Sequence, residues 1–94
     1  MSSEQAKKAP VPRAQDNLRE SLQRRLMDAE SRMKRSQVVV DWQKRLIDDM
    51  AKRNHSDIGF AREVLAMLYD SLNWNEAQVK QIKSELDFLN RRSN

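Results

Sequence analysis

The stretch Asp70–Leu86, DSLNWNEAQVKQIKSEL, decides whether the C-terminal half of this chain is one helix or two. Asn73 followed by Glu76 resembles a helix N-cap with its returning carboxylate, the arrangement that satisfies two backbone N–H groups at a helix start. Asn also tolerates the left-handed conformation that a turn requires. We therefore predict that one helix ends near residue 72 and that another begins at Trp74.

The segment upstream of this corner has its own break at "RNHSD", residues 53–57. Asn54 can close a preceding helix, and Ser56 can cap a following one. The predicted helix over residues 57–72 is the most apolar of the chain, with one line of hydrophobic residues and a second line beside it (Ile58, Ala61, Leu65, Leu68, Leu72; Phe60, Val64, Met67). Such a helix is buried on more than one side.

A long helix is predicted over residues 14–53, which contain neither Gly nor Pro. An apolar seam with alternating spacings of four and three follows it, interrupted by polar Ser36 and Gln43 (Leu22, Leu26, Ala29, Met33, Val40, Ile47, Met50). Residues 1–13 are polar and contain Pro10 and Pro12, which predicts a disordered lead.

The two halves of the long helix differ in the width of their apolar surface. The N-terminal half carries one narrow stripe, whereas the stripe Val39–Trp42–Leu46 joins the seam in the C-terminal half. A narrow stripe fits one partner helix and a broad arc fits two. We expect the C-terminal half to carry the other helices of the chain. The N-terminal half should then lack a cover and pair with a second chain through a dimer or partner seam (Leu18, Leu22, Leu26, Met33).

The predicted fold is therefore all-α. A long N-terminal helix carries two shorter helices, residues 57–72 and 74–90, folded back on its C-terminal half. This is a helical bundle with a projecting coiled-coil-like arm, and residues 14–94 form a single helical domain. Trp42 and Trp74 have two interpretations, core packing between the helices or, for Trp42, an interface anchor.

Two regions suggest an alternative function in nucleic-acid binding. The corner at Asn73 has the spacing of a helix-turn-helix, which would present Asn75, Lys80 and Gln81 to DNA. The basic N-terminal half could instead lie along a phosphate backbone (Arg24, Arg25, Arg32, Arg35). Tyr69 occupies the crossing point where a small residue is wanted, and acidic residues interrupt the basic half. A capped bundle corner and a solvated helix explain the same residues without these conflicts.

The composition excludes several classes of function. The 94 residues include no cysteine and one histidine, His55, so neither a thiol nucleophile nor a converging set of metal ligands is expected. No Gly-rich phosphate loop and no nucleophile–base spacing occurs. We expect no enzyme activity, no cofactor and no small-molecule substrate. No apolar run is long enough for a membrane span, and the N-terminus is not a secretory signal, which predicts an intracellular, cytoplasmic protein.

The leading hypothesis from the sequence is a non-enzymatic protein–protein interaction module of the adaptor, chaperone or inhibitor type. It would self-associate as a dimer through its long helix, bind a helical protein partner, or do both. The alternative is a DNA-binding regulator, suggested by the net charge of +4 and the pI of about 9.8. A third hypothesis is a structural subunit that folds only within a larger assembly.

Overall fold

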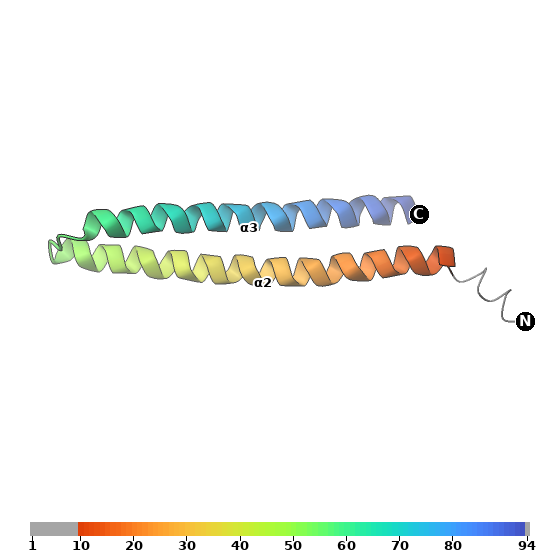
Figure 1. The fold of residues 1–94 in the computed structure, drawn as a ribbon, viewed down its shortest axis with the longest axis horizontal. Coiled ribbons are helices and arrows are strands. Elements are labelled where there is room, and N and C mark those ends of the chain that lie inside the picture. Colours follow the sequence, from red (N-terminus) through yellow and green to blue (C-terminus); the bar gives the residue numbers. More distant parts are fainter. Residues whose placement is uncertain (1–9, 94) are drawn as a thin grey trace, which may run out of the picture.

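Two long antiparallel helices make up the described part of the chain, residues 10–93 of a computed structural model (Figure 1). Helix α2 spans Pro10–Lys52 and helix α3 spans Ile58–Ser93. The chain reverses direction over residues 53–57, so the start of α2 and the end of α3 lie at the same end of the molecule (Figure 1). The all-α prediction is confirmed, but the described fold is a helical hairpin and not a three-helix bundle.

Helix α2 begins earlier than the sequence predicted, at Pro10 instead of residue 14. The first four N–H groups of a helix have no acceptor within the helix, so proline loses no hydrogen bond in the first turn. Pro10 and Pro12 both occupy that turn and are compatible with it. Residues 1–9 of the predicted disordered lead lie outside the described residues.

The reversal after α2 depends on one residue in the left-handed conformation. Asn54 has a φ of 51°, as predicted for the residue that closes the first helix. The N–H of Asn54 donates to the carbonyl of Ala51 at 3.2 Å, and the N–H of His55 donates to that of Met50 at 3.0 Å. This pair of bonds is the Schellman arrangement, which satisfies carbonyls left free at the helix end. Helix α3 then begins directly after Asp57, whose N–H donates to His55 Nδ1 at 3.1 Å.

Helix α3 runs without a break through Asn73, so the predicted division into helices 57–72 and 74–90 is wrong. The physical reason is the continuity of its apolar seam. Leu68, Leu72, Asn75, Val79 and Ile82 keep the alternating spacing of four and three, which holds them on one face of a continuous helix. A turn at Asn73 would change the phase of this seam and remove Val79 and Ile82 from it.

The two helices pack along matching heptad seams, with positions a and d facing the other helix. In α2 the a positions begin at Arg19 and the d positions at Leu22, and in α3 they begin at Ile58 and Ala61. Every a and d position in residues 19–50 and 58–89 is buried or half-buried. The largest core cluster joins four buried residues near the middle and open end of the hairpin (Leu22, Ala29, Val79, Ile82).

Polar residues within the seam are paired with the opposite helix. Asn75 Nδ2 donates to Ser36 Oγ at 2.6 Å, close to the midpoint of both helices. Gln43 Nε2 donates to the carbonyl oxygen of Ala61 at 3.0 Å nearer the chain reversal. Ser36 and Gln43 therefore do not interrupt the seam. They set its register, because a buried polar group must keep its partner.

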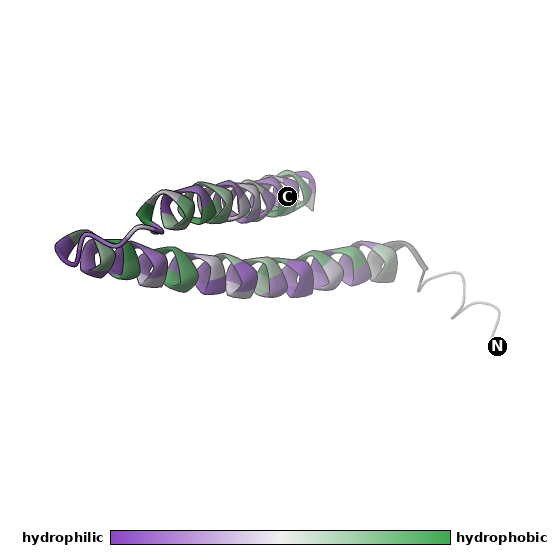
Figure 2. Ribbon diagram, turned by 60° about the vertical axis from the view of Figure 1, so that its left-hand side comes forward, coloured by the Kyte–Doolittle hydropathy of each residue, from purple (hydrophilic) through white to green (hydrophobic). Residues whose placement is uncertain are grey.

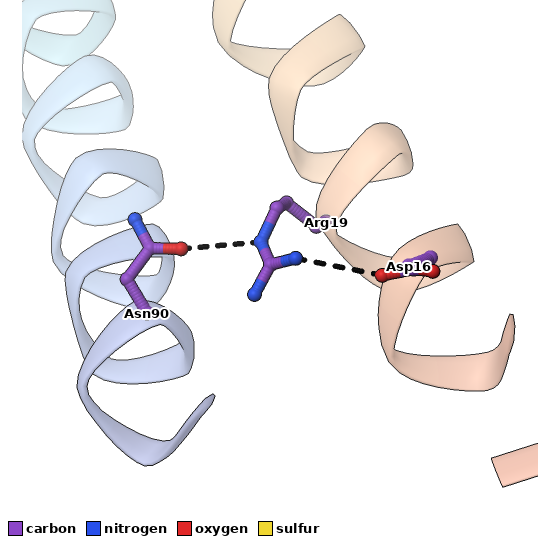
Figure 3. Close-up of polar contacts among 3 residues, drawn as sticks. All are labelled: Asp16, Arg19 and Asn90. Carbon is purple, nitrogen blue, oxygen red and sulfur yellow. Dashed lines mark hydrogen bonds and ion pairs between the residues drawn. The ribbon is translucent and has the colours of Figure 1, made fainter. Parts of the chain in front are cut away.

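The projecting arm predicted for the N-terminal half of α2 is absent, because α3 is long enough to cover it. Leu22, Leu26 and Ala29 pack in the cluster with the C-terminal half of α3. Near the open end, Arg19 links both helices (Figure 3). Its Nε donates to Asn90 Oδ1 at 3.1 Å, and its Nη1 lies 3.5 Å from Asp16 Oδ1.

The hairpin is one helix thick, measuring 78 × 24 × 14 Å. Two helices in a single layer leave both sides of the seam between them open to solvent. Seven hydrophobic residues are buried among the described residues, but ten large hydrophobic residues are exposed. Neither described helix is long and apolar enough to cross a membrane. The ten exposed hydrophobic residues are the feature of this thin layer that calls for a functional explanation.

Asn54→Ala should lower the free energy of unfolding by about 1 kcal/mol, because alanine is strained at a positive φ. Asn54→Gly should be neutral or slightly stabilising, since glycine adopts this conformation freely. Urea unfolding followed by circular dichroism measures both. Equal stability of the two variants would show that the left-handed reversal at residue 54 is absent.

Asn75→Ala should cost about 1–2 kcal/mol, because it removes the bond to Ser36 and leaves that hydroxyl in the seam without its partner. Asn73→Ala is the matched control, since Asn73 is exposed in the same helix. It should change stability by less than about 0.5 kcal/mol. The same urea titration compares them. A larger loss for Asn73→Ala than for Asn75→Ala would restore the capped corner and contradict a continuous α3.

Candidate functional site

Hydrophobic side chains collect on one face of the hairpin. Position g is the residue before each a, and position c is the residue before each d. Of the ten exposed large hydrophobic residues, eight occupy one of these two positions (Leu18, Val39, Trp42, Leu46, Phe60, Met67, Trp74, Phe88). The ribbon coloured by hydropathy shows hydrophobic turns recurring along both helices (Figure 2). We call positions g and c of both helices the g/c face.

The g positions of α2 and α3 border the same side of the seam. A cavity of about 230 Å³ is lined by Arg35, Ser36 and Val39 of α2 together with Leu68 and Ser71 of α3. Val39 and Ser71 are both g residues, so the g lines of the two helices flank one groove. The exposed hydrophobic residues at positions g and c of the two helices therefore lie on the same side of the layer.

The opposite side of the layer, positions e and b, is predominantly polar. There Lys44 Nζ lies 5.6 Å from the centre of the Tyr69 ring. A side-chain hydrogen bond to Tyr69 raises the pKa of Lys44, and the charges of Asp41 and Asp48 act in the same direction. The g/c face therefore carries most of the exposed large hydrophobic residues, together with charged residues, whereas the e/b side carries only Met27 of them.

Six of the eight residues lie between the middle of the hairpin and the chain reversal, and we call this set the apolar band (Val39, Trp42, Leu46, Phe60, Met67, Trp74). All six are uncharged and exposed, and both tryptophans of the chain belong to it. Core packing of the two tryptophans, one of the two sequence interpretations, is wrong: no third helix folds back to cover them. The interpretation of Trp42 as an interface anchor stays a prediction.

The open end of the g/c face has a different character, and the surface there extends over the outer side of α3 to positions f and b (Ala77, Ser84, Lys80). A groove of about 840 Å³ lies there, which we call the basic groove (Leu18, Leu22, Arg25, Ala77, Lys80, Gln81, Ser84, Glu85, Phe88, Leu89, Arg92). Three basic side chains and one carboxylate line it. The Arg92 guanidinium lies 5.5 Å from the centre of the Phe88 ring. Glu85 Oε2 is buried and has no hydrogen-bond partner among the described residues.

The residues predicted as a dimer seam lie mostly inside the hairpin. Leu22 is only 5% exposed, and Leu26 and Met33 pack against its cluster. The prediction that this stripe lacks a cover within the chain is wrong, because the C-terminal half of α3 provides the cover. Only Leu18, at 51% exposure, remains open to a partner.

The residues of the nucleic-acid alternative are dispersed. Asn75 is buried against Ser36, so it cannot reach a base. Because α3 has no turn at Asn73, the predicted helix-turn-helix is also wrong. Arg25, Lys80 and Gln81 come together in the basic groove. Of the other arginines, Arg24 pairs with Glu20 at 3.9 Å, Arg35 lines the smaller cavity beside Val39, and Arg32 is exposed at a g position.

Sequence reasoning assigned Phe60 and Met67 to a buried surface and gave Phe88 no role. The available signal was a spacing of seven residues in α3, with Phe60, Met67, Trp74 and Phe88 all in the c phase and Gln81 between the last two. This repeat lies beside the a/d seam and extends over the whole helix. A second hydrophobic phase on one helix indicates a second packing surface.

No group of three or more His, Asp or Glu residues suited to holding a metal ion occurs among the residues that the structure describes. Comparison of the chain with protein-family models, curated proteins and solved structures gave no significant match. The g/c face is therefore the feature on which a functional proposal can rest.

Leu22→Asp should unfold the hairpin, because it places an unpaired carboxylate in the core cluster at a cost of more than about 3 kcal/mol. Leu18→Asp, one helical turn away and half exposed, should change stability by about 1 kcal/mol or less. Thermal unfolding by circular dichroism separates the two. A folded Leu22→Asp protein that has merely lost self-association would support the projecting arm and contradict the hairpin.

Proposed function

We propose that this chain is a non-enzymatic helical interaction module that self-associates through the apolar band. The single observation that carries the proposal is the position of the exposed hydrophobic residues, eight of ten on one face of a layer 14 Å thick. Scattered surface hydrophobic residues need no explanation, but a contiguous patch indicates an interaction surface. Two hairpins stacked on this face would give four helices around a shared core, as in four-helix bundles.

The apolar band offers enough area for a specific interface. Burying an aromatic side chain completely removes about 150–250 Å² from water. Trp42, Phe60 and Trp74 are 60–69% exposed. The three together therefore offer on the order of 300–500 Å², to which Val39, Leu46 and Met67 add. The total approaches the roughly 800 Å² per partner of a standard interface.

A second copy of the chain is the occupant that the band fits best. In a two-fold symmetric contact each patch meets its own copy, so the surface must be complementary to itself. The band itself is uncharged, and the exposed charged residues around it include both signs (Arg35, Asp49, Arg53, Asp57), so two copies do not meet with a large excess of like charge. The basic grooves at the open ends each carry three basic groups and one acid, so they repel each other. We infer that the bands overlap with the open ends pointing in opposite directions.

This arrangement predicts a dimer longer than one hairpin. Light scattering after gel filtration at tens of micromolar should give twice the monomer mass of 11.1 kDa. Trp42→Glu should reduce it to the monomer mass with helical content unchanged, because a buried, unpaired carboxylate opposes pairing. Met27→Glu is the matched control, since Met27 is also 67% exposed but lies on the opposite side of α2. It should leave the dimer intact.

Two further readouts test the same contact. Both tryptophans belong to the band, so their emission should shift to shorter wavelength as protein concentration rises. Small-angle X-ray scattering of the dimer should give a longest dimension well above the 78 Å of one chain. A monomer at every concentration would refute self-association, and equal loss of the dimer in both Glu variants would refute the band as its surface.

A further inference from the structure

The basic groove has features that self-association does not use. It lies toward the open end of the hairpin and shares no residue with the apolar band, and its volume of about 840 Å³ falls in the range of sites that accept ligands or side chains. Its floor is apolar, formed by Leu18, Leu22 and Leu89. Its rim is basic, formed by Arg25, Lys80 and Arg92. An apolar floor with a basic rim matches an amphipathic segment whose flanks are acidic.

Two further features of the groove favour a segment with acidic flanks. Phe88 stands exposed beside the groove with the Arg92 guanidinium 5.5 Å from its ring centre, so an aromatic anchor and a cation occupy the same part of the rim. On the α2 side Arg25 supplies a planar group that can bind a carboxylate with two hydrogen bonds. A segment lying in the groove can therefore receive charge pairing on both flanks.

Glu85 adds a second requirement, for a hydrogen-bond donor. Its Oε2 is buried without a hydrogen-bond partner among the described residues, which is costly for a carboxylate oxygen. A bound helix presents free N–H groups at its first turn, and these are suitable donors to an anion. The oxygen is covered by the protein itself, so a docked segment would reach it only after the Glu85 side chain turns toward the groove.

We propose that the basic groove docks an amphipathic helix of a partner protein, with apolar residues at i, i+3, i+4 and i+7 and Asp or Glu on the flanks. This mode of recognition lays the apolar stripe of one helix into a groove between others. A second copy of this chain is a poor occupant, because the two grooves carry the same excess of positive charge. Nucleic acid fits less well, because phosphates gain nothing from the leucine floor and are repelled by Glu85.

The test uses the full chain and three probes in fluorescence anisotropy titrations. The first is a synthetic peptide of about four helical turns with leucines in the stated pattern and glutamates on both flanks. The second has the same leucines with lysine flanks, and the third is a random-sequence DNA duplex. The Glu-flanked peptide should bind at least tenfold more tightly than the Lys-flanked peptide, with an affinity that falls as salt rises.

Variants with matched charge locate the binding. The double variant Arg25→Glu with Lys80→Glu should lower the affinity for the Glu-flanked peptide by tenfold or more. Arg24→Glu with Lys83→Glu makes the same change of net charge outside the groove and should leave the affinity within twofold. All four side chains are exposed, so the helical content should not change. Phe88→Ala should also lower the affinity for this peptide. A purely electrostatic attraction would not predict that loss.

The result is separable from self-association. Trp42→Glu, which removes the proposed dimer contact, should still bind the Glu-flanked peptide, because the band and the groove share no residue. Absence of binding by that peptide, equal binding of both peptides, or equal loss in the two double variants would overturn the groove as an acidic-helix site. Tighter binding of the duplex, lost on Arg25→Glu with Lys80→Glu, would overturn it in favour of nucleic acid.

Discussion

The hydrogen bond from Asn75 to Ser36 fixes the register on which the rest of the hairpin depends. It is a 2.6 Å contact near the midpoint of both helices, in a seam that is otherwise apolar over most of its length. Sliding one helix along the other would strand both polar groups among hydrophobic side chains, whereas an all-apolar seam would tolerate several registers. With this register Leu22 and Ala29 pack in one cluster with Val79 and Ile82, and the g lines of both helices border one groove.

A layer of only two helices leaves most of the surface of each helix uncovered. Each helix buries only the part of its surface that faces the other, so a second hydrophobic phase on either helix remains in solvent. Here that second phase occurs on both helices and on the same side. The opposite side is occupied by polar and charged residues, as in the Lys44–Tyr69 contact. This asymmetry, more than total hydrophobicity, is the basis of the proposed interaction surface.

The charges along the g/c face divide it into two regions. Near the chain reversal large exposed hydrophobic residues lie among charged side chains of both signs, and we propose that this surface meets its own copy. Toward the open end arginine and lysine side chains surround a leucine floor, which disfavours an identical surface and favours an acidic one. On the two proposals above, the chain would join copies of itself through one region and hold a different protein through the other. The two proposed contacts use separate residues and can therefore operate together.

The sequence by itself determined the helical class, the reversal at Asn54 and most of the seam in α2. These depend on local properties: the absence of Gly and Pro, the tolerance of asparagine for a positive φ, and the spacing of apolar residues. It also revealed the second stripe at Val39, Trp42 and Leu46. Only the tertiary structure decided what each stripe faces. The cap-like pattern at Asn73 is locally valid, but the heptad phase carried through Asn75 overrides it, because a helix packed along a continuous seam gains more from that packing than from a cap. The continuous α3 covers Leu22 and exposes Trp42 and Trp74, the reverse of the sequence prediction, because which residues are buried depends on where the partner helix runs.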